Sequence, residues 1–279
     1  MPAYNPGLSK IADDNILVVK HISSLDNPLF KQLKKLAESA RERRKAAVAL
    51  LDGVHLVESA LQAAIMPQLL VVSESGATRT EVVHLRQKLS GVQTAMLTDG
   101  LFAEISPVET PSGVLALIET PHLQAPSRPD FALLLEDVQD PGNLGTLLRS
   151  AAAAGVQVVW LSAGCADAWS PKVLRAGMGA HFVLAMEERV NLLEKTAGFP
   201  GVTVATSLAA SRSLYELDLT GPVALLAGNE GAGLSGGLLA AANIQIRIPM
   251  PGRIESLNVA AATSICLFER VRQCVAKVR

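Results

Sequence analysis

Apolar runs and amphipathic segments alternate along nearly the whole chain. In its first part we expect strands at 47–51, 69–73, 93–97 and 114–119, and helices at 54–64, 81–89 and 101–106. In its second part we expect strands at 132–136, 156–161, 183–186, 203–206, 223–227 and 245–248, with helices between them and a last helix at about 257–277. Several of these strands are continuous apolar runs, which is typical of a parallel sheet covered on both faces. The pattern predicts an α/β fold.

A basic amphipathic helix is expected before the first strand. It starts after Asn27, and Leu29, Leu33 and Leu36 form an apolar stripe at helical spacing. The stretch 31–45 on this helix carries a net charge of +5. Charge runs are usually solvated helix faces, but a basic face also suits RNA phosphates.

The composition of one short segment divides the chain into two units. Residues 121–130 hold three prolines and few apolar side chains, which is typical of a linker. We therefore expect a first unit at 23–120 and a second at 131–279. Residues 1–22 are predicted to form a poorly anchored N-terminal arm.

Charge and composition narrow the classes of function. The net charge is −1, and cations and anions balance in both parts of the chain, so a globally basic nucleic-acid binder is excluded. Any RNA must bind a local patch. Three cysteines without Cys-x-x-Cys spacing argue against a disulfide framework, and five histidines show no metal-ligand spacing. Without a signal-peptide pattern or an apolar run that could span a membrane, we expect a cytoplasmic protein.

Three motifs follow strands of the second unit. Residues 140–149 form a turn of Pro, Gly and Asn that leads into an alanine-rich helix, and 226–235 form a glycine-rich turn that lets backbone amides approach a ligand. Residues 248–260 form a Pro/Gly loop before the last helix, and such helix starts attract polar or anionic groups. Asn143 and Ser256 are expected to cap the two helices. Ligands of open α/β sheets bind beyond the carboxyl ends of strands, so the motifs predict a binding site.

The glycine-rich turn contains a second, weaker signal. Glycines at 231, 233 and 236 match the dinucleotide fingerprint Gly-x-Gly-x-x-Gly. They lie late in the chain, Asn229 and Glu230 separate them from the strand, and the helix after them is short. A nicotinamide- or flavin-dependent enzyme is therefore only the third hypothesis.

Together the three motifs resemble those of the SpoU/TrmH family of RNA ribose 2′-O-methyltransferases, a branch of the SPOUT superfamily. Residues 170–180 resemble the segment after the first family motif. In the first unit, 51–57 and 110–114 resemble the small L30e-like substrate-binding domain that precedes the catalytic domain in many members. The order and spacing of the motifs make the match specific, and it extends from about residue 23 to the end of the chain. Three departures, none of which removes a residue of the expected site, are Asp52 in place of Glu, Ser150 in place of Thr and Gly177 in place of Ser.

The resemblance implies a SPOUT-type α/β domain whose C-terminal segment threads a trefoil knot, and S-adenosylmethionine bound in that knot. It also implies a homodimer, because the family's active site usually lies at a dimer interface. The implied cofactor-binding residues are Thr206, Ser207, Gly228, Asn229, Ile248, Met250 and Leu257. The implied catalytic residues are Asn143, Arg149, Glu230, Ser256 and Asn258. The residues expected to contact RNA are Lys31, Lys34, Lys35, Arg41, Arg43, Arg44, Lys172 and Arg175.

The resemblance also assigns roles to these polar residues. In the family, the residue that matches Arg149 is implicated in activating the 2′-hydroxyl. A guanidinium stays protonated and is a poor base, so we assign Arg149 positioning and electrostatic support first and a general-base role second. Asn143 would orient Arg149 or the ribose, while Glu230 and the two residues near the last helix would hold the loops and the nucleotide. The sulfonium methyl is already electrophilic, so no metal is expected.

Two hypotheses precede the dinucleotide enzyme. The leading one is an S-adenosylmethionine-dependent RNA 2′-O-methyltransferase, with 23S ribosomal RNA favoured as the substrate and transfer RNA left open. The second is an RNA-binding or assembly protein that keeps the fold but not the catalysis. The intact set of polar site residues argues against this second hypothesis.

Overall fold

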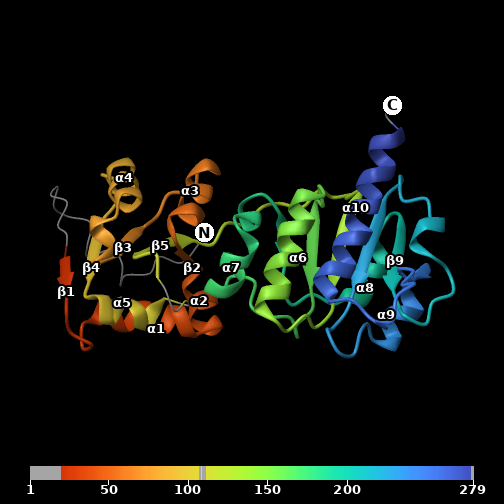
Figure 1. Ribbon diagram of the computed structural model, residues 1–279, viewed down its shortest axis with the longest axis horizontal. Coiled ribbons are helices and arrows are strands. Elements are labelled where there is room, and N and C mark those ends of the chain that lie inside the picture. Colours follow the sequence, from red (N-terminus) through yellow and green to blue (C-terminus); the bar gives the residue numbers. More distant parts are fainter. Residues whose placement is uncertain (1–19, 107, 109–110, 278–279) are drawn as a thin grey trace.

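Two β-sheets, each packed between helices, lie side by side along the long axis of the molecule (Figure 1). The computed structural model describes residues 20–106, 108 and 111–277. Residues 1–19 of the predicted N-terminal arm, and Thr110 of the second stretch that resembles the substrate-binding domain, lie outside the described residues.

The first sheet has five strands in the order β1-β4-β3-β5-β2. Strand β5 runs antiparallel to both of its neighbours, while β3, β4 and β1 pair in parallel. The elements of this unit are β1 (Lys20–Ile22), α1 (Pro28–Glu38), α2 (Ala40–Ala46), β2 (Val48–Asp52), α3 (Val54–Gln62), β3 (Leu69–Ser73), the 3-10 helix η2 (Gly76–Thr78), α4 (Thr80–Lys88), β4 (Thr94–Leu97), α5 (Asp99–Ile105) and β5 (Val114–Glu119).

Two sequence predictions about this unit are wrong. The arm does not extend to residue 22, because β1 pairs with β4 and its Ile22 is buried in the core. The basic segment is not one helix, because the chain leaves the helical conformation at Ser39. The Ser39 hydroxyl accepts a hydrogen bond from the amide of Glu42 at 3.3 Å and so caps α2, which starts a new helix axis.

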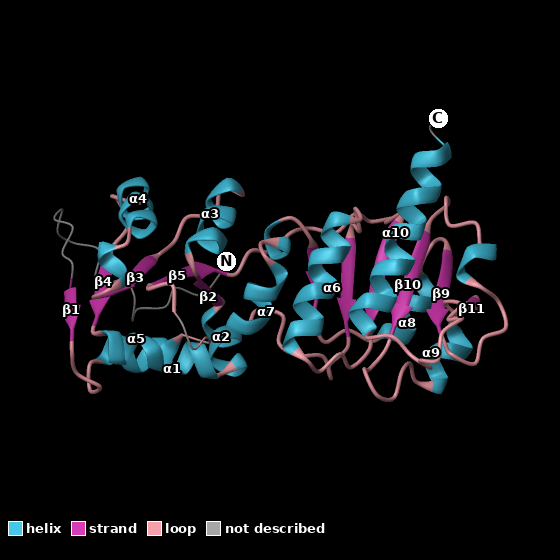
Figure 2. Ribbon diagram, in the orientation of Figure 1, coloured by secondary structure: helices cyan, strands magenta, loops and turns pink. Residues whose placement is uncertain are grey.

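The second sheet is entirely parallel, as the apolar runs predicted. Its order is β11-β9-β10-β6-β7-β8. Figure 2 shows β10, β9 and β11 beside one another in this sheet. Its elements are β6 (Phe131–Leu135), α6 (Pro141–Ala153), β7 (Val158–Leu161), α7 (Pro171–Gly177), η3 (Ala180–Phe182), β8 (Ala185–Glu187), α8 (Leu192–Gly198), β9 (Val202–Thr206), η4 (Leu214–Glu216), β10 (Val223–Ala227), α9 (Gly236–Ala241), β11 (Ile244–Ile246) and α10 (Val259–Lys277).

Successive side chains along these strands enter opposite cores, because strand residues alternate between the faces of a sheet. Leu133 packs with α6 and α10, whereas Leu134 packs with α8 and α9 on the other face. The first sheet is covered in the same way, by α3 and α4 on one face and by α1 and α5 on the other. The core under α6 and α10 is continuous with that under α3, since α7 packs against β2 across the junction (Figure 1).

Candidate active site

A chain of polar side chains lies where β6 and β10 end and α10 begins. Asn143 in α6 donates from Nδ2 to Oε1 of Glu230 at 3.2 Å. Its own Oδ1 accepts a hydrogen bond from Nδ2 of Asn258 at 2.9 Å. Asn143 and Glu230 meet because the carboxyl ends of β6 and β10 are neighbours in the sheet, and Asn258, 115 positions after Asn143, meets it because α10 packs on α6. The structure therefore brings together three of the five predicted catalytic residues.

The Glu230 carboxylate is held by several donors at once. Besides Asn143, the backbone amides of Asp140 and Gln139 donate to its two oxygens at 3.1 and 3.4 Å. Partial burial by itself would raise the pKa of Glu230, but these hydrogen bonds and one from its own amide together keep that pKa below the usual value. The site therefore presents a fixed negative charge at neutral pH.

Two predicted helix caps are wrong, and the residues that cap these helices instead explain why the Asn143 side chain can reach Glu230 and Asn258. Asp140, not Asn143, caps α6: its Oδ1 accepts from the amide of Asn143 at 2.7 Å. Asn258, not Ser256, caps α10, since its Oδ1 accepts from the amide of Ala260 at 2.9 Å. Because Asp140 performs the capping, the Asn143 side chain is free to bridge Glu230 and Asn258.

A cavity of about 440 Å³ opens beside this cluster, between the loops that follow β9, β10 and β11. All seven predicted cofactor-binding residues line it, and so do Glu230 and Ser256. Lining residues within the motifs that were not assigned to the site are Gly231, Ala232, Gly233, Leu234 and Val259, and lining residues outside the motifs are Leu208, Ala209, Leu239, Ile246, Arg247 and Ala262. The loop after β9 could have been found from the rule that ligands bind beyond the carboxyl ends of parallel strands.

The lining suits a flat, uncharged ring joined to a cationic group. Ile246, Ile248 and Leu257 supply apolar walls, while the Glu230 carboxylate provides negative charge at the rim. The turn from Gly228 to Gly233 is closed by a pair of backbone hydrogen bonds between Asn229 and Gly233, both 3.0 Å long. The volume is within the usual range for cofactor sites. The residues present thus fit S-adenosylmethionine, with its adenine ring and sulfonium charge.

Arg149 is not part of this cluster. It lies six residues after Asn143 on α6, so the two side chains point about 120° apart around the helix axis. Arg149 is exposed and borders a separate hollow of about 430 Å³ between α3, α6 and η3. It makes no hydrogen bond or ion pair with any residue that the structure describes. Within one copy of the chain, the described residues show no polar contact of Arg149 with Glu230 or Asn143.

The residues expected to contact RNA fall into three groups. Lys35, Arg41, Lys172 and Arg175 are exposed. Lys31, Lys34 and Arg44 lie at the surface within ion-pair distance of acidic side chains, and such pairs are weak enough to yield to phosphates. Arg43 is the exception and was wrongly assigned, because its side chain is only 4% exposed and its donors are engaged within the protein.

Across 20–106, 108 and 111–277, no group of three or more His, Cys, Asp or Glu side chains is arranged to hold a metal ion. Among the helices in those ranges, none has the length and apolar character needed to cross a bilayer.

Two sequence-family profiles match the chain. The profile of the SpoU rRNA Methylase family matches residues 130–268, and that of the MRM3-like substrate binding domain matches residues 27–116. The first match includes every residue of the polar cluster and cavity described above. The second covers α1 to α5 and most of the first sheet.

Individual proteins similar to this chain are also RNA methyltransferases by name. An uncharacterized tRNA/rRNA methyltransferase from Synechocystis is 35% identical, over 91% of this chain and 94% of its own length. The 23S rRNA (guanosine(2553)-2′-O)-methyltransferase RlmP of Bacillus subtilis is 36% identical, over 90% of this chain and 98% of its own length. A crystal structure of an AdoMet-bound rRNA methyltransferase from Sinorhizobium meliloti superimposes with a TM-score of 0.76 at 31% identity, covering 91% of this chain and 97% of that one.

Proposed function

This chain belongs to the SpoU rRNA methylase family, and on that premise we propose that it transfers a methyl group from S-adenosylmethionine to a ribose 2′-hydroxyl of 23S ribosomal RNA. The observation that carries the proposal is the junction of the polar cluster with the cavity: Glu230 belongs to both. The names of similar proteins support ribosomal RNA and the 2′-O position.

Bound S-adenosylmethionine supplies an electrophilic methyl group. The loops after β9, β10 and β11 would enclose the cofactor and exclude water from its apolar part. The Asn143 side chain, fixed at both ends by Glu230 and Asn258, would orient the ribose at the rim. Because these groups are held before the substrate arrives, little reorganisation is needed at the moment of reaction.

We further propose that the enzyme works as a homodimer in which Arg149 serves the site of the partner copy. In its own copy Arg149 is exposed and lies on a different face of α6 from Asn143. A guanidinium supplied by a second chain would stabilise the developing alkoxide without acting as the base. The hydroxyl proton would pass to water, and the sulfur would keep the electron pair of the broken S–C bond as S-adenosylhomocysteine leaves. RNA would extend across the exposed cations of α1, α2 and α7 toward this site.

The proposed domains follow from the same assignment. Residues from β1 to 120 would form the substrate-binding unit, 121–130 the linker and 131–279 the methyltransferase unit. The trefoil knot implied by the family stays a prediction.

The decisive experiment is a methyl-transfer assay. Purified protein would be incubated with labelled S-adenosylmethionine and, in parallel, with unmodified 23S ribosomal RNA and unmodified transfer RNA. We expect label as 2′-O-methylribose in the ribosomal RNA, and an Arg149→Ala variant should lose it while still binding cofactor. Label in transfer RNA alone would change the assigned substrate from ribosomal to transfer RNA. No label in either RNA, despite cofactor binding, would contradict the proposed methyltransferase function.

Mixing two inactive variants tests the homodimer. If Arg149 acts in the partner's site, Arg149→Ala and Glu230→Gln chains mixed and re-associated should regain activity, because one site of each heterodimer is intact. If both residues act within one copy, the mixture stays inactive.

A further inference from the structure

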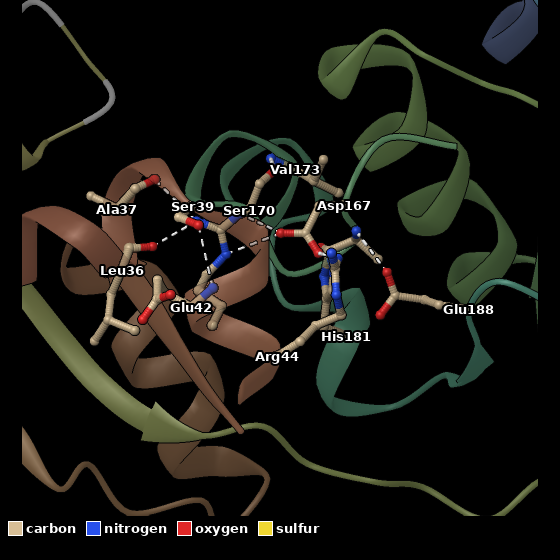
Figure 3. Close-up of polar contacts among 12 residues, drawn as sticks. Leu36, Ala37, Ser39, Glu42, Arg44, Asp167, Ser170, Val173, His181 and Glu188 are labelled. Atoms are coloured by element: carbon tan, nitrogen blue, oxygen red, sulfur yellow. Dashed lines mark hydrogen bonds and ion pairs between the residues drawn. The ribbon is translucent and has the colours of Figure 1, made fainter. Parts of the chain in front are cut away.

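Arg43 joins the two units of the molecule through a buried guanidinium. Its Nε and Nη2 both donate to Oδ2 of Asp167, at 3.0 Å from Nε, although Asp167 belongs to the second unit, 124 residues later. Its Nη1 donates to the carbonyl oxygens of Leu36 and Ala37, at 2.6 and 3.0 Å, in the last turn of α1. The Arg43 and Asp167 side chains are 4% and 11% exposed. Figure 3 shows Asp167 facing the end of α1 across this junction.

Arg44 adds a longer contact, 3.5 Å from its Nη1 to Oδ1 of Asp167, and the remaining contacts of the junction are less directional. Helix α7 packs its apolar face against β2, and a β-carbon at Gly179 would lie only 2.9 Å from Cβ of Ser59. Apolar contacts tolerate sliding and rotation, because the hydrophobic effect is non-directional. A planar guanidinium that binds a carboxylate and two carbonyls at once permits a single arrangement.

The segment that carries Asp167 also braces the loop between β6 and α6. The amide of Ala166 donates to the carbonyl oxygen of Val138 at 2.8 Å. Ser162 donates its hydroxyl to Oδ1 of Asp137 and accepts from the Asp137 amide at 2.9 Å. Asp137 adopts a left-handed conformation, with φ of 51°, and these bonds maintain it.

The braced loop leads directly into the proposed active site. The carbonyl of Asp137 accepts a hydrogen bond from Nδ2 of Asn229 at 2.8 Å. The next two amides, of Gln139 and Asp140, donate to the carboxylate of Glu230. A short series of hydrogen bonds and adjacent backbone therefore runs from the first unit to Glu230.

We propose that Arg43 and Asp167 are positioning residues that hold the substrate-binding unit in register with the cofactor cavity. This role rests on the proposed function. The ion pair would ensure that RNA held by the first unit reaches the cavity with its ribose aligned for methyl transfer. The pair contacts neither RNA nor cofactor. It acts through the junction and through the braced loop that fixes Glu230.

A positioning role for Arg43 and the phosphate contact predicted from the sequence have opposite consequences when Asp167 loses its charge. For a phosphate contact, Asp167→Asn would remove a neighbouring negative charge and leave RNA binding equal or stronger. For a positioning pair, the same change removes the charge that orients the buried guanidinium, so methyl transfer falls.

The test compares Asp167→Asn, Arg43→Lys and the double variant with wild type. Arg43→Lys keeps the charge, but an ammonium cannot reproduce the planar fork between Asp167 and the α1 carbonyls. Arg272→Gln is the control, because Arg272 forms an ion pair with Glu269 on α10, outside the junction, and is 67% exposed. Each protein would be checked for folding by thermal unfolding and for cofactor affinity by calorimetry.

Three readouts decide the matter. Single-turnover methyl transfer to ribosomal RNA should fall at least about tenfold in both single variants, since small misplacements of reacting groups are costly. Cofactor affinity should stay within about twofold, and the double variant should be no slower than the worse single one, as expected for one shared contact. Hydrogen exchange at the Ala166 amide should be faster in both single variants and unchanged in Arg272→Gln.

Wild-type transfer rates in Asp167→Asn, or unchanged exchange at Ala166 in folded variants, would overturn the proposal. If wild type itself methylates no ribosomal RNA, the proposed function fails separately. The exchange measurement then still decides whether the ion pair braces the loop.

Discussion

Replacing Gly228 with alanine tests whether the turn after β10 is a rigid wall of the cofactor cavity. Gly228 is buried at the end of β10, and a β-carbon there would lie 2.2 Å from the carbonyl carbon and oxygen of Gly233. It would also lie 2.4 Å from the amide nitrogen of Leu234. These are backbone atoms, so no side chain can rotate away, and the turn has to move by about 1 Å or more to reach normal contact distance.

The expected cost follows from what such a movement breaks. The two 3.0 Å hydrogen bonds between Asn229 and Gly233 close the turn, and each contributes about 1 kcal/mol. Overpacking adds about 1–3 kcal/mol. Alanine also stiffens the unfolded chain, which offsets only about 0.4–1 kcal/mol. A net loss of about 2–5 kcal/mol remains, and if it falls on binding, cofactor affinity drops at least about 30-fold.

Calorimetric titration with S-adenosylmethionine would measure the affinity, and urea unfolding would show how much of the cost falls on stability. Gly252→Ala is the matched control, because Gly252 lies in the neighbouring loop and a β-carbon there meets nothing within 4 Å. A Gly228→Ala variant with both affinity and stability close to wild type would show that the turn moves at no cost and is not a rigid wall of the cavity.

Two further predictions concern the core beneath the site. Gly145→Ala should lower the free energy of unfolding by about 1–3 kcal/mol, because its β-carbon would lie 2.4 Å from Cβ of Ala176 and 2.6 Å from the carbonyl oxygen of Val173. Urea unfolding would measure this loss, with Gly198→Ala as the control because a β-carbon at Gly198 meets nothing within 4 Å. Helix propensity alone predicts that Gly145→Ala raises the free energy of unfolding, and that result would contradict close packing of α6 on α7. Burial lowers the pKa of His181 to about 4, so protonation favours the unfolded chain, and stability should decline by about 3 kcal/mol as pH falls from 6.5 to 4. A His181→Gln variant should show a shallower decline over that range, and parallel curves for the two proteins would count against the buried neutral imidazole.

The sequence predicted those parts of the candidate site that depend on residues close together in the chain. Continuous apolar runs marked β6, β7 and β10 in the middle of the second sheet, because a strand covered on both faces needs apolar residues at every position. Five of the seven predicted cofactor-binding residues lie in the motifs after β10 and β11, the other two lie at and just after the end of β9, and all seven line one cavity. The rule for open α/β sheets indicated the edge of the sheet, and the resemblance to the SpoU/TrmH family indicated the individual residues.

The exact contacts of polar side chains were not predictable in the same way. Asn143 looked like a helix cap because Asn often is one. Asp140, three residues earlier, takes that position, and Asn143 turns to Glu230 instead. Which of two suitable residues caps the helix depends on partners that lie far away in the sequence.

What the sequence determined by itself was the class of fold, the two units and the positions of the motifs, since these depend on local hydrophobic period and turn chemistry. The tertiary structure alone decided how residues distant in sequence meet. Arg43 belongs to a basic run and looked like an RNA contact, yet Asp167 holds it in the junction. Arg149 looked like a neighbour of Asn143, yet the helix turns it away. The charge and spacing of these residues can be read from the sequence, but the burial and hydrogen-bond partners of their side chains are established only when the two sheets pack together.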